Sequence, residues 1–300
     1  MKLRNSLDKL TSRFARDRVD HHDRIVVSCP GLRLVVRVGE TGMRWDPQQY
    51  GQFSDERSRP FFDLVAQVRA EAPHGVVDLG CGSGELTATL AVRWPGADVT
   101  GVDSSPQMIE RAKSLTGAPA NLCFETGDIA DWHIESDVDV MVSNAALQWV
   151  PTHRELIQEW ARMASSGTWL AWQVPGNFGA PSHVLMRELA ESSEWSGRLA
   201  GVLRHDQPVA EPAEYLAMLT REGFAAQAWE TTYLHVLQGP DPVLEWVRGT
   251  ALRPIFAVLD EAESRTFEAQ YAALLREAYP PREMGTIFEF RRIFCVGRKQ

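Results

Sequence analysis

The stretch from Val76 to Asp103 constrains the fold of this chain more than any other. A short apolar run ends in Asp78, a turn follows with glycines at 80, 82 and 84, and an apolar, Ala-rich segment leads to a second apolar run that ends in Asp103. Glycine lets a turn adopt positive φ and lets a ligand approach bare backbone. The pattern predicts a strand, a glycine turn, a helix and a strand, with a carboxylate where each strand stops. In nucleotide-binding βαβ units the second carboxylate accepts hydrogen bonds from ribose hydroxyls.

The glycine spacing separates two classes of nucleoside cofactor. The dinucleotide fingerprint is G-x-G-x-x-G, whereas Gly80, Gly82 and Gly84 alternate. Glu85 would also repel a pyrophosphate at the start of the following helix. S-adenosylmethionine carries a sulfonium and an ammonium in place of phosphate, and nearby acids suit both. We therefore expect S-adenosylmethionine and disfavour a nucleotide-dependent oxidoreductase. Glu85 is equally explained as an ordinary first-turn acid, which leaves the spacing as the main argument.

Strands and helices continue to alternate after Asp103. Apolar runs predict strands at 122–124, 138–143 and 167–174, and amphipathic periodicity predicts a helix at 154–164. Such alternation implies a parallel sheet with right-handed crossovers.

Polar residues mark the ends of four of these strands. Asp78, Asp103, Asp128 and Asn144 fall there, one per strand. Ligands of parallel sheets bind beyond the carboxyl ends of the strands. This coincidence favours a cofactor site at that edge more than any single motif does.

The pattern changes after Pro175. We expect a strand at 228–237 and a final strand at 288–297, with the helical segments at 56–70, 183–203, 213–222 and, for the most part, 243–279.

The residues from Asp78 to Gly84, together with Asp103, resemble motif I of class I S-adenosylmethionine-dependent methyltransferases. More specific stretches resemble the trans-aconitate 2-methyltransferases, from about Met43 to the C-terminus: Trp45–Tyr50, Ser143–Pro151, Val174–Phe178 with Pro181–His183, Glu230–His235 and Thr286–Arg292. The resemblance implies an α/β, Rossmann-like class I methyltransferase fold. Such a fold has a mostly parallel seven-stranded sheet with an antiparallel last strand, and helical insertions cover the substrate. We expect this cap at about 176–208 and 239–285 of a methyltransferase domain spanning 43–300.

Residues 1–42 stand apart from that domain. They carry nine Lys or Arg and five Asp or Glu, a net charge of 9 − 5 = +4, against −13 for the rest of the chain. Three aspartates argue against a transit peptide, and no signal-peptide pattern is visible. We expect either a loosely held or disordered extension or a natural start at Met43.

The composition excludes several classes of function. A net charge of −9 argues against broad nucleic-acid binding. No apolar run approaches the ~20 residues that cross a bilayer. Four scattered cysteines without a C-x-x-C pair predict reduced thiols in a cytoplasmic protein and no metal site. The oligomeric state is left open.

The expected cofactor site combines the glycine turn with the strand ends. The glycines let backbone approach the methionine part, Asp78 supports the amino group and Asp103 takes the ribose hydroxyls. Asp128 is expected near the adenine amino group, and Asn144 and Ala145 under the sulfonium. The full set is Trp45, Asp78, Gly80, Gly82, Gly84, Asp103, Ser104, Asp128, Asn144 and Ala145. Met108 packs either on the adenine or in the core.

A second set of residues is expected to bind the acceptor. A polyanionic acceptor needs Arg, Tyr, His, Trp or Asn partners, and arginine is the most discriminating. Arg291 and Arg292 are neighbours on a strand, so at most one of them points into the site. Tyr233 and His235 share a face, although His235 is equally explained as a structural histidine. The full set is Tyr50, Trp149, His183, Tyr233, His235, Arg291 and Arg292.

The resemblance implies transfer of a methyl group from S-adenosylmethionine to one carboxylate of trans-aconitate. A carboxylate is already a nucleophile at neutral pH, so no general base is required. The alternatives are another small acid, amine or phenol as acceptor, and an S-adenosylmethionine-binding regulator without catalysis.

Overall fold

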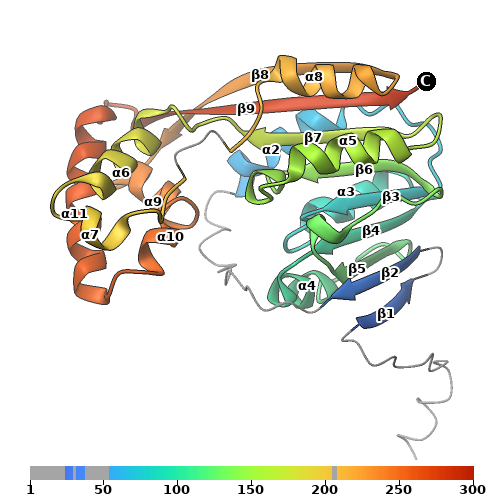
Figure 1. Cartoon of the computed structure of the whole chain (residues 1–300), viewed down its shortest axis with the longest axis horizontal. Helices are drawn as coiled ribbons and strands as arrows, with labels where there is room; N and C mark the ends of the chain where they lie inside the picture. The colour runs from blue at the N-terminus through green and yellow to red at the C-terminus, as the bar shows by residue number, and fades with distance from the viewer. Residues whose placement is uncertain (1–23, 30–31, 38–53, 205–207) are drawn as a thin grey trace, which may run out of the picture. The chain divides into compact units, whose positions relative to one another are not determined.

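The computed structural model of this chain describes residues 24–29, 32–37, 54–204 and 208–300 (Figure 1). The chain divides into two units, Met1–Gly42 and Met43–Gln300. In the first unit, β1 (Arg24–Cys29) pairs antiparallel with β2 (Leu32–Arg37). The predicted loose extension lies mostly outside the described residues.

The second unit is built on a seven-stranded sheet in the order β5-β4-β3-β6-β7-β9-β8 (Figure 1). The five strands from β5 to β7 in this order run parallel to one another, and β9 runs antiparallel to both of its neighbours. The strands are β3 (Gly75–Leu79), β4 (Asp98–Asp103), β5 (Leu122–Thr126), β6 (Val138–Asn144), β7 (Trp169–Pro175), β8 (Phe224–Leu237) and β9 (Thr286–Lys299). The predicted fold class, with seven strands and an antiparallel last strand, is confirmed.

Helices cover both faces of this sheet. On one face, Phe61 and Leu64 of α2 (Ser54–Val65) and Leu90 of α3 (Glu85–Arg93) share a buried cluster with strand residues. On the other face lie α5 (His153–Met163) and α8 (Pro212–Arg221). There the Tyr215 ring meets Trp172 edge-on at 5.4 Å, and its hydroxyl lies 2.9 Å from His153 Nε2. The chain also forms α4 (Pro106–Lys113) and the short 3₁₀ turns η1 (Ile129–Asp131) and η2 (Leu147–Trp149).

Five helices gather at one end of the long β8–β9 hairpin (Figure 1). They and the hairpin share a second buried cluster, which includes Trp246, Phe267, Tyr271 and Phe288. The helices are α6 (Pro181–Glu191), α7 (Ser196–Leu199), α9 (Pro242–Arg248), α10 (Arg253–Phe256) and α11 (Glu261–Ala278). Among the helices that the structure describes, none is both long and apolar enough to span a bilayer.

The predicted helical stretches 183–203 and 243–279 are each interrupted. A cap explains the last break: Asp260 Oδ1 accepts from the backbone N–H groups of Ala262 and Glu263, at 2.9 Å each, and so starts α11. Strand β8 begins four residues before the predicted boundary, because Gly223 (φ 78°) ends α8 and the Ala-rich start of the strand carries little β signal.

Gly101, in the middle of β4, gives a direct test of this packing. An added Cβ would lie 2.6 Å from Phe124 Cδ1 and 3.0 Å from Cys81 Cβ. We expect Gly101→Ala to lower the free energy of unfolding by about 1–3 kcal/mol through overpacking. Gly96→Ala is the matched control, since nothing among the described residues lies within 4 Å of its added Cβ. Urea unfolding followed by tryptophan fluorescence checks both; equal loss in the two variants would contradict the packing.

Candidate functional site

The glycine turn lies where β3 ends and is held against the neighbouring strand β4. The backbone N–H groups of Gly80 and Cys81 donate to the Val102 carbonyl at 2.7 and 3.0 Å. Gly80 has φ 80°, and an added Cβ would lie 2.2 Å from Ala146 Cβ, so only glycine fits there. Gly82 also has positive φ (57°), but nothing among the described residues lies within 4 Å of its added Cβ. At Gly82, therefore, the turn exposes bare backbone that no described residue covers.

Asp103, at the end of β4, connects the turn to the next helix. One carboxylate oxygen accepts from the Gly82 N–H and the other from the Ser105 N–H, both at 2.9 Å. Burial raises the pKa of this carboxyl, and the two backbone hydrogen bonds oppose the rise. Ser104, which lies between Asp103 and Ser105 in the sequence, is exposed. Asp103 thus orients the turn from the end of β4.

Asp78 is buried one strand away, at the end of β3. Its Oδ2 accepts from the Thr87 hydroxyl at 2.6 Å, whereas its Oδ1 has no hydrogen-bond partner among the described residues. Burial raises the pKa of Asp78 from 3.8 to about 7; the Thr87 hydrogen bond lowers it and the charge of Asp103 raises it further. A buried carboxylate oxygen without a partner is costly. A bound cation would satisfy it.

The next two strand ends hold three more of the predicted cofactor residues. Asp128 Oδ1 caps η1 by accepting from the Ala130 N–H at 2.9 Å. Asn144 Oδ1 accepts from Gln173 Nε2 at 2.8 Å. Ala145 has the unusual φ of 54°, and its N–H donates to the Gln173 carbonyl at 3.0 Å. Such a left-handed non-glycine residue is strained and is held by its surroundings.

The residues at these strand ends fit S-adenosylmethionine. The unpartnered oxygen of Asp78 suits an ammonium group, the open side of Gly82 suits close approach of a ligand, and no phosphate is needed. Glu85 lies in the first turn of α3, 3.7 Å from Arg111, and this ion pair accounts for it without a ligand. Met108 is buried in α4, with 5% exposure.

The structure places Arg291 and Arg292 on opposite faces of β9, as alternation requires. Arg291 Nε donates to Glu230 at 3.0 Å and its Nη1 donates to Glu211 at 3.2 Å. Arg292 is buried, with its guanidinium 4.5 Å above the Phe290 ring.

Tyr233 and His235 share one face of β8, and their rings lie 6.3 Å apart. The Tyr233 hydroxyl donates to Asp63 of α2 at 2.7 Å. The His235 ring stacks on Trp246 of α9 at 4.8 Å. This face therefore carries an aromatic wall that runs from the sheet to the helical cluster.

The other predicted acceptor residues are more dispersed. His183 lies in the first turn of α6, and burial, with the charge of Arg187, lowers its pKa to about 4. It is therefore neutral at pH 7 and can offer a hydrogen bond but no charge. Trp149 is half-buried at the end of η2. Tyr50 lies outside the described residues, as does Trp45 of the predicted cofactor set.

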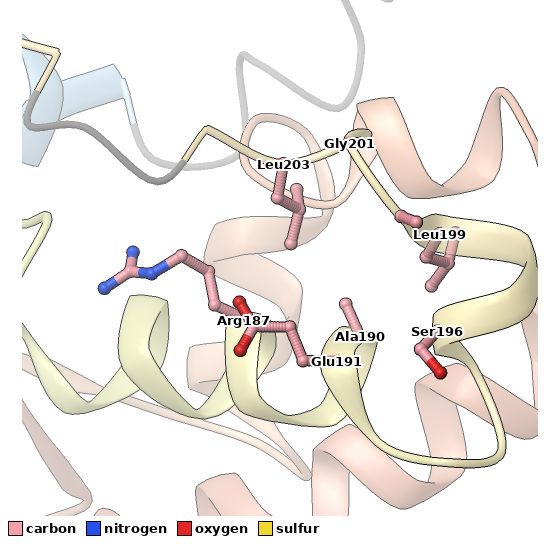
Figure 2. A pocket seen from close by; sticks show the side chains of 8 residues that line it. Arg187, Ala190, Glu191, Ser196, Leu199, Gly201 and Leu203 are labelled. Carbon is pink, nitrogen blue, oxygen red and sulfur yellow. The ribbon is translucent and has the colours of Figure 1, made fainter.

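A cavity of about 210 Å³ lies away from the strand ends, between α6, α7 and the loop after α7 (Figure 2). The Arg187 guanidinium leaves this cavity, donates to the Phe178 carbonyl at 2.8 Å and lies over the Phe178 ring. Small and apolar side chains line most of the remainder. None of the predicted site residues lines this cavity, so it does not coincide with the predicted site.

Several residues near the candidate site were missed by the sequence reasoning. They are Asp63, Thr87, Gln173, Glu211 and Trp246. Glu230 opens a stretch that carries the resemblance, but its pairing with Arg291 has no local signal. Apart from Thr87, these residues make contacts with residues that are distant in sequence, so residue spacing alone could not predict them. Thr87 is the exception, because it lies on the helix that follows the glycine turn.

The raised pKa of Asp78 predicts a pH-dependent stability. Because the folded-state pKa (about 7) lies above the unfolded value of 3.8, the stabilisation is complete below about pH 4 and is lost as the pH rises through 7. We expect the free energy of unfolding of the ligand-free wild-type protein to fall, relative to that of Asp78→Asn, as the pH rises from about 4 to about 7. Urea titrations at several pH values check this, with the exposed Asp98→Asn as control. A constant difference between wild type and Asp78→Asn across the range would contradict the raised pKa.

Comparison with known proteins identifies the family. Residues 76–167 match a family model described as a methyltransferase domain. A trans-aconitate 2-methyltransferase of Streptomyces avermitilis is 50% identical over 261 residues, which cover 85% of this chain and 97% of the relative. One from Rhodococcus jostii is 50% identical over 258 residues, which cover 85% of this chain and all of the relative.

Solved structures agree on the fold. The YcgJ protein of Bacillus subtilis superposes with a TM-score of 0.54 at 17% identity, covering 81% of this chain and 98% of that one. Phosphoethanolamine N-methyltransferase 2 of Haemonchus contortus, in complex with S-adenosyl-L-methionine, superposes with a TM-score of 0.50 at 12% identity, covering 84% and 56%. At these identities the likeness concerns the fold alone. The close sequence relatives go further: this chain belongs to the trans-aconitate 2-methyltransferase family.

Proposed function

We propose that this chain uses S-adenosylmethionine to methylate one carboxylate of trans-aconitate, giving the monomethyl ester. The observation that carries the proposal is 50% identity to trans-aconitate 2-methyltransferases over 85% of the chain. The strand-end geometry supports it independently, because a glycine turn, the buried carboxylate of Asp78 and the half-buried carboxylate of Asp103 suit a cationic nucleoside.

When bound, S-adenosylmethionine supplies a methyl group activated by the positive charge on sulfur. The acceptor oxygen forms its bond to the methyl carbon as the carbon–sulfur bond breaks, so the products are an ester and S-adenosylhomocysteine. An ionised carboxylate has no proton to lose, so the chain needs no general base. Its task is to hold donor and acceptor in line, which accounts for most of the rate.

The assignment of roles follows from the contacts at the strand ends. Asp78, with its unpartnered oxygen, receives the ammonium group, and Asp103 receives the ribose hydroxyls from a carboxylate already fixed by two backbone N–H groups. Asp128 faces the adenine, while Asn144 and Ala145 lie beneath the reacting end. Trp45 belongs to the donor side of the proposal, and Tyr50, Trp149 and His183 belong to the acceptor side. The five helices around 176–208 and 239–285 form the cap.

The reaction itself is tested by transfer of label. Wild-type protein with methyl-labelled S-adenosylmethionine and trans-aconitate should release labelled ester that hydrolyses in base to methanol. Label on another acid from a panel of small acids would move the proposal to that acceptor. Tight binding of S-adenosylhomocysteine without transfer to any acceptor would contradict methyl transfer and favour a regulatory binding protein.

Asp103 tests the placement of the donor. We expect Asp103→Ala to weaken binding of S-adenosylhomocysteine by about 10²-fold, because hydrogen bonds to a charged group contribute roughly 1.5–3 kcal/mol each. Asp98→Ala, an exposed acid at the start of the same strand, is the matched control. Isothermal titration calorimetry measures both affinities. Unchanged affinity in Asp103→Ala would contradict the role of this carboxylate.

A further inference from the structure

We infer that Thr87 is a positioning residue for the methyl donor: its hydroxyl holds one oxygen of the Asp78 carboxylate and leaves the other oxygen for the ammonium group of S-adenosylmethionine. The inference rests on the donor binding of the proposed function and adds to it the residue that prepares the ammonium site. It does not depend on which acceptor is methylated.

Thr87 lies in the first turn of α3, immediately after the glycine turn, and is completely buried. Its hydroxyl donates to Asp78 Oδ2 at 2.6 Å. The β-branched side chain of threonine has few rotamers in a helix, so the donor atom is held in place. Hydrogen bonds to an ionised group are shorter and stronger than those between neutral groups. Thr87 therefore fixes the orientation of the carboxylate from the side of α3.

The second oxygen of Asp78 is the one left for a ligand. Asp78 is 2% exposed, and its Oδ1 has no hydrogen-bond partner in the part of the chain that the structure describes. A buried carboxylate oxygen in this state is costly. The glycine turn that follows leaves room for a ligand, since no described residue lies within 4 Å of a Cβ added at Gly82. An ammonium group brings three N–H donors and a positive charge, and both satisfy Oδ1.

Strand register places the ammonium site beside the expected ribose site. Asp78 of β3 pairs with Gly101 of β4, and Asp103 lies two positions further along β4. Side chains two positions apart project from the same face of a sheet. The two carboxylates therefore lie on neighbouring strands and on one face, as a ligand with an ammonium at one end and a ribose in the middle requires.

The Thr87 hydrogen bond also acts on the protonation of Asp78. Burial raises the pKa of Asp78 from 3.8 to about 7, the Thr87 hydrogen bond opposes this rise, and the charge of Asp103 adds to it. The Cys81 thiol of the glycine turn also faces these carboxylates. Burial, followed by the charges of Asp78 and Asp103, raises the pKa of Cys81, so this thiol stays neutral near pH 7.

Other charged side chains on the packed elements lie elsewhere. On α3, Glu85 is 3.7 Å from Arg111, and Arg93 lies in the last turn of the helix. On β6, Asp139 is 3.3 Å from His74, at the opposite end of the sheet. Asp103 is therefore the carboxylate whose charge acts on Asp78.

Donor binding is consequently linked to a proton. An ammonium group binds the ionised form of Asp78, which has a pKa of about 7 in the free protein. Below this pH, binding must displace the Asp78 proton to solvent, so the affinity falls as the pH falls through 7. Loss of the Thr87 hydroxyl removes a contribution that lowers the pKa, and it should move the fall in affinity to higher pH.

The test compares the affinities of two ligands for the full chain by isothermal titration calorimetry. S-adenosylhomocysteine carries the ammonium group, whereas 5′-methylthioadenosine has the same nucleoside and a thioether without the amino-acid part. Wild type should lose about tenfold affinity for S-adenosylhomocysteine from about pH 8 to about pH 6 and release nearly one proton at the lower pH, measured in buffers of different ionisation enthalpy. The affinity for 5′-methylthioadenosine corrects for titration of Asp103, because both ligands carry the ribose.

Variants of α3 separate the hydroxyl from the packing of the helix. Thr87→Val keeps the shape without the donor. It should weaken S-adenosylhomocysteine about tenfold at pH 7 and move the fall in affinity upward by about one pH unit. Thr87→Ser keeps the hydroxyl and should retain most of the affinity and the pH profile. Thr89→Val is the matched control, because the Thr89 hydroxyl donates to the Leu86 carbonyl of the same helix; its affinities should stay within about twofold of wild type.

Three results would overturn the inference. These are an unchanged affinity and pH profile in Thr87→Val, an equal loss of affinity for the two ligands in that variant, and equal proton release by wild type with both ligands. The last comparison needs no variant, so it holds even where Thr87→Val does not fold. Failure of wild type to bind S-adenosylhomocysteine would contradict the proposed function as well. Binding as described without methyl transfer to trans-aconitate would contradict the proposed reaction and leave the role of Thr87 intact.

Discussion

Asp103 joins the two strand–loop junctions on which the rest of the site depends. Its two oxygens accept from Gly82 in the glycine turn and from Ser105 before α4, so one carboxylate fixes both loops at the carboxyl edge of the sheet. The same edge holds Asp78, whose second oxygen has no partner in the described part of the chain. Hydrogen bonds within the chain therefore fix the shape and orientation of the turn, and the charge beside it is negative. This combination selects a cationic nucleoside over one that carries phosphate.

The antiparallel strand β9 extends the sheet beyond the end of its parallel part. Because it lies between β7 and β8 and extends past the end of β7, it carries side chains from the sheet edge toward the helical cluster. One face of this extension is closed by the pairing of Arg291 with two glutamates, and the other carries Arg292 and the aromatic wall.

Local patterns were sufficient for the strands and their ends. Apolar runs that stop at Asp78, Asp103 and Asn144 predict both the strand and the edge at which its polar residue lies, because side-chain period and strand length are local properties. The helical cluster was predicted less well, since its breaks depend on caps such as Asp260 and on tertiary packing. The face of Arg291 and Arg292 could not be predicted at all. It depends on register with two other strands and on a glutamate 80 residues away.

The most direct test is a crystal structure of the protein with S-adenosylhomocysteine and trans-aconitate bound together. We expect the ribose on Asp103, the amino group on Asp78 and one acceptor carboxylate oxygen facing the sulfur. Density for the nucleoside away from the glycine turn, or for the acceptor at a distance from the sulfur, would contradict this expectation.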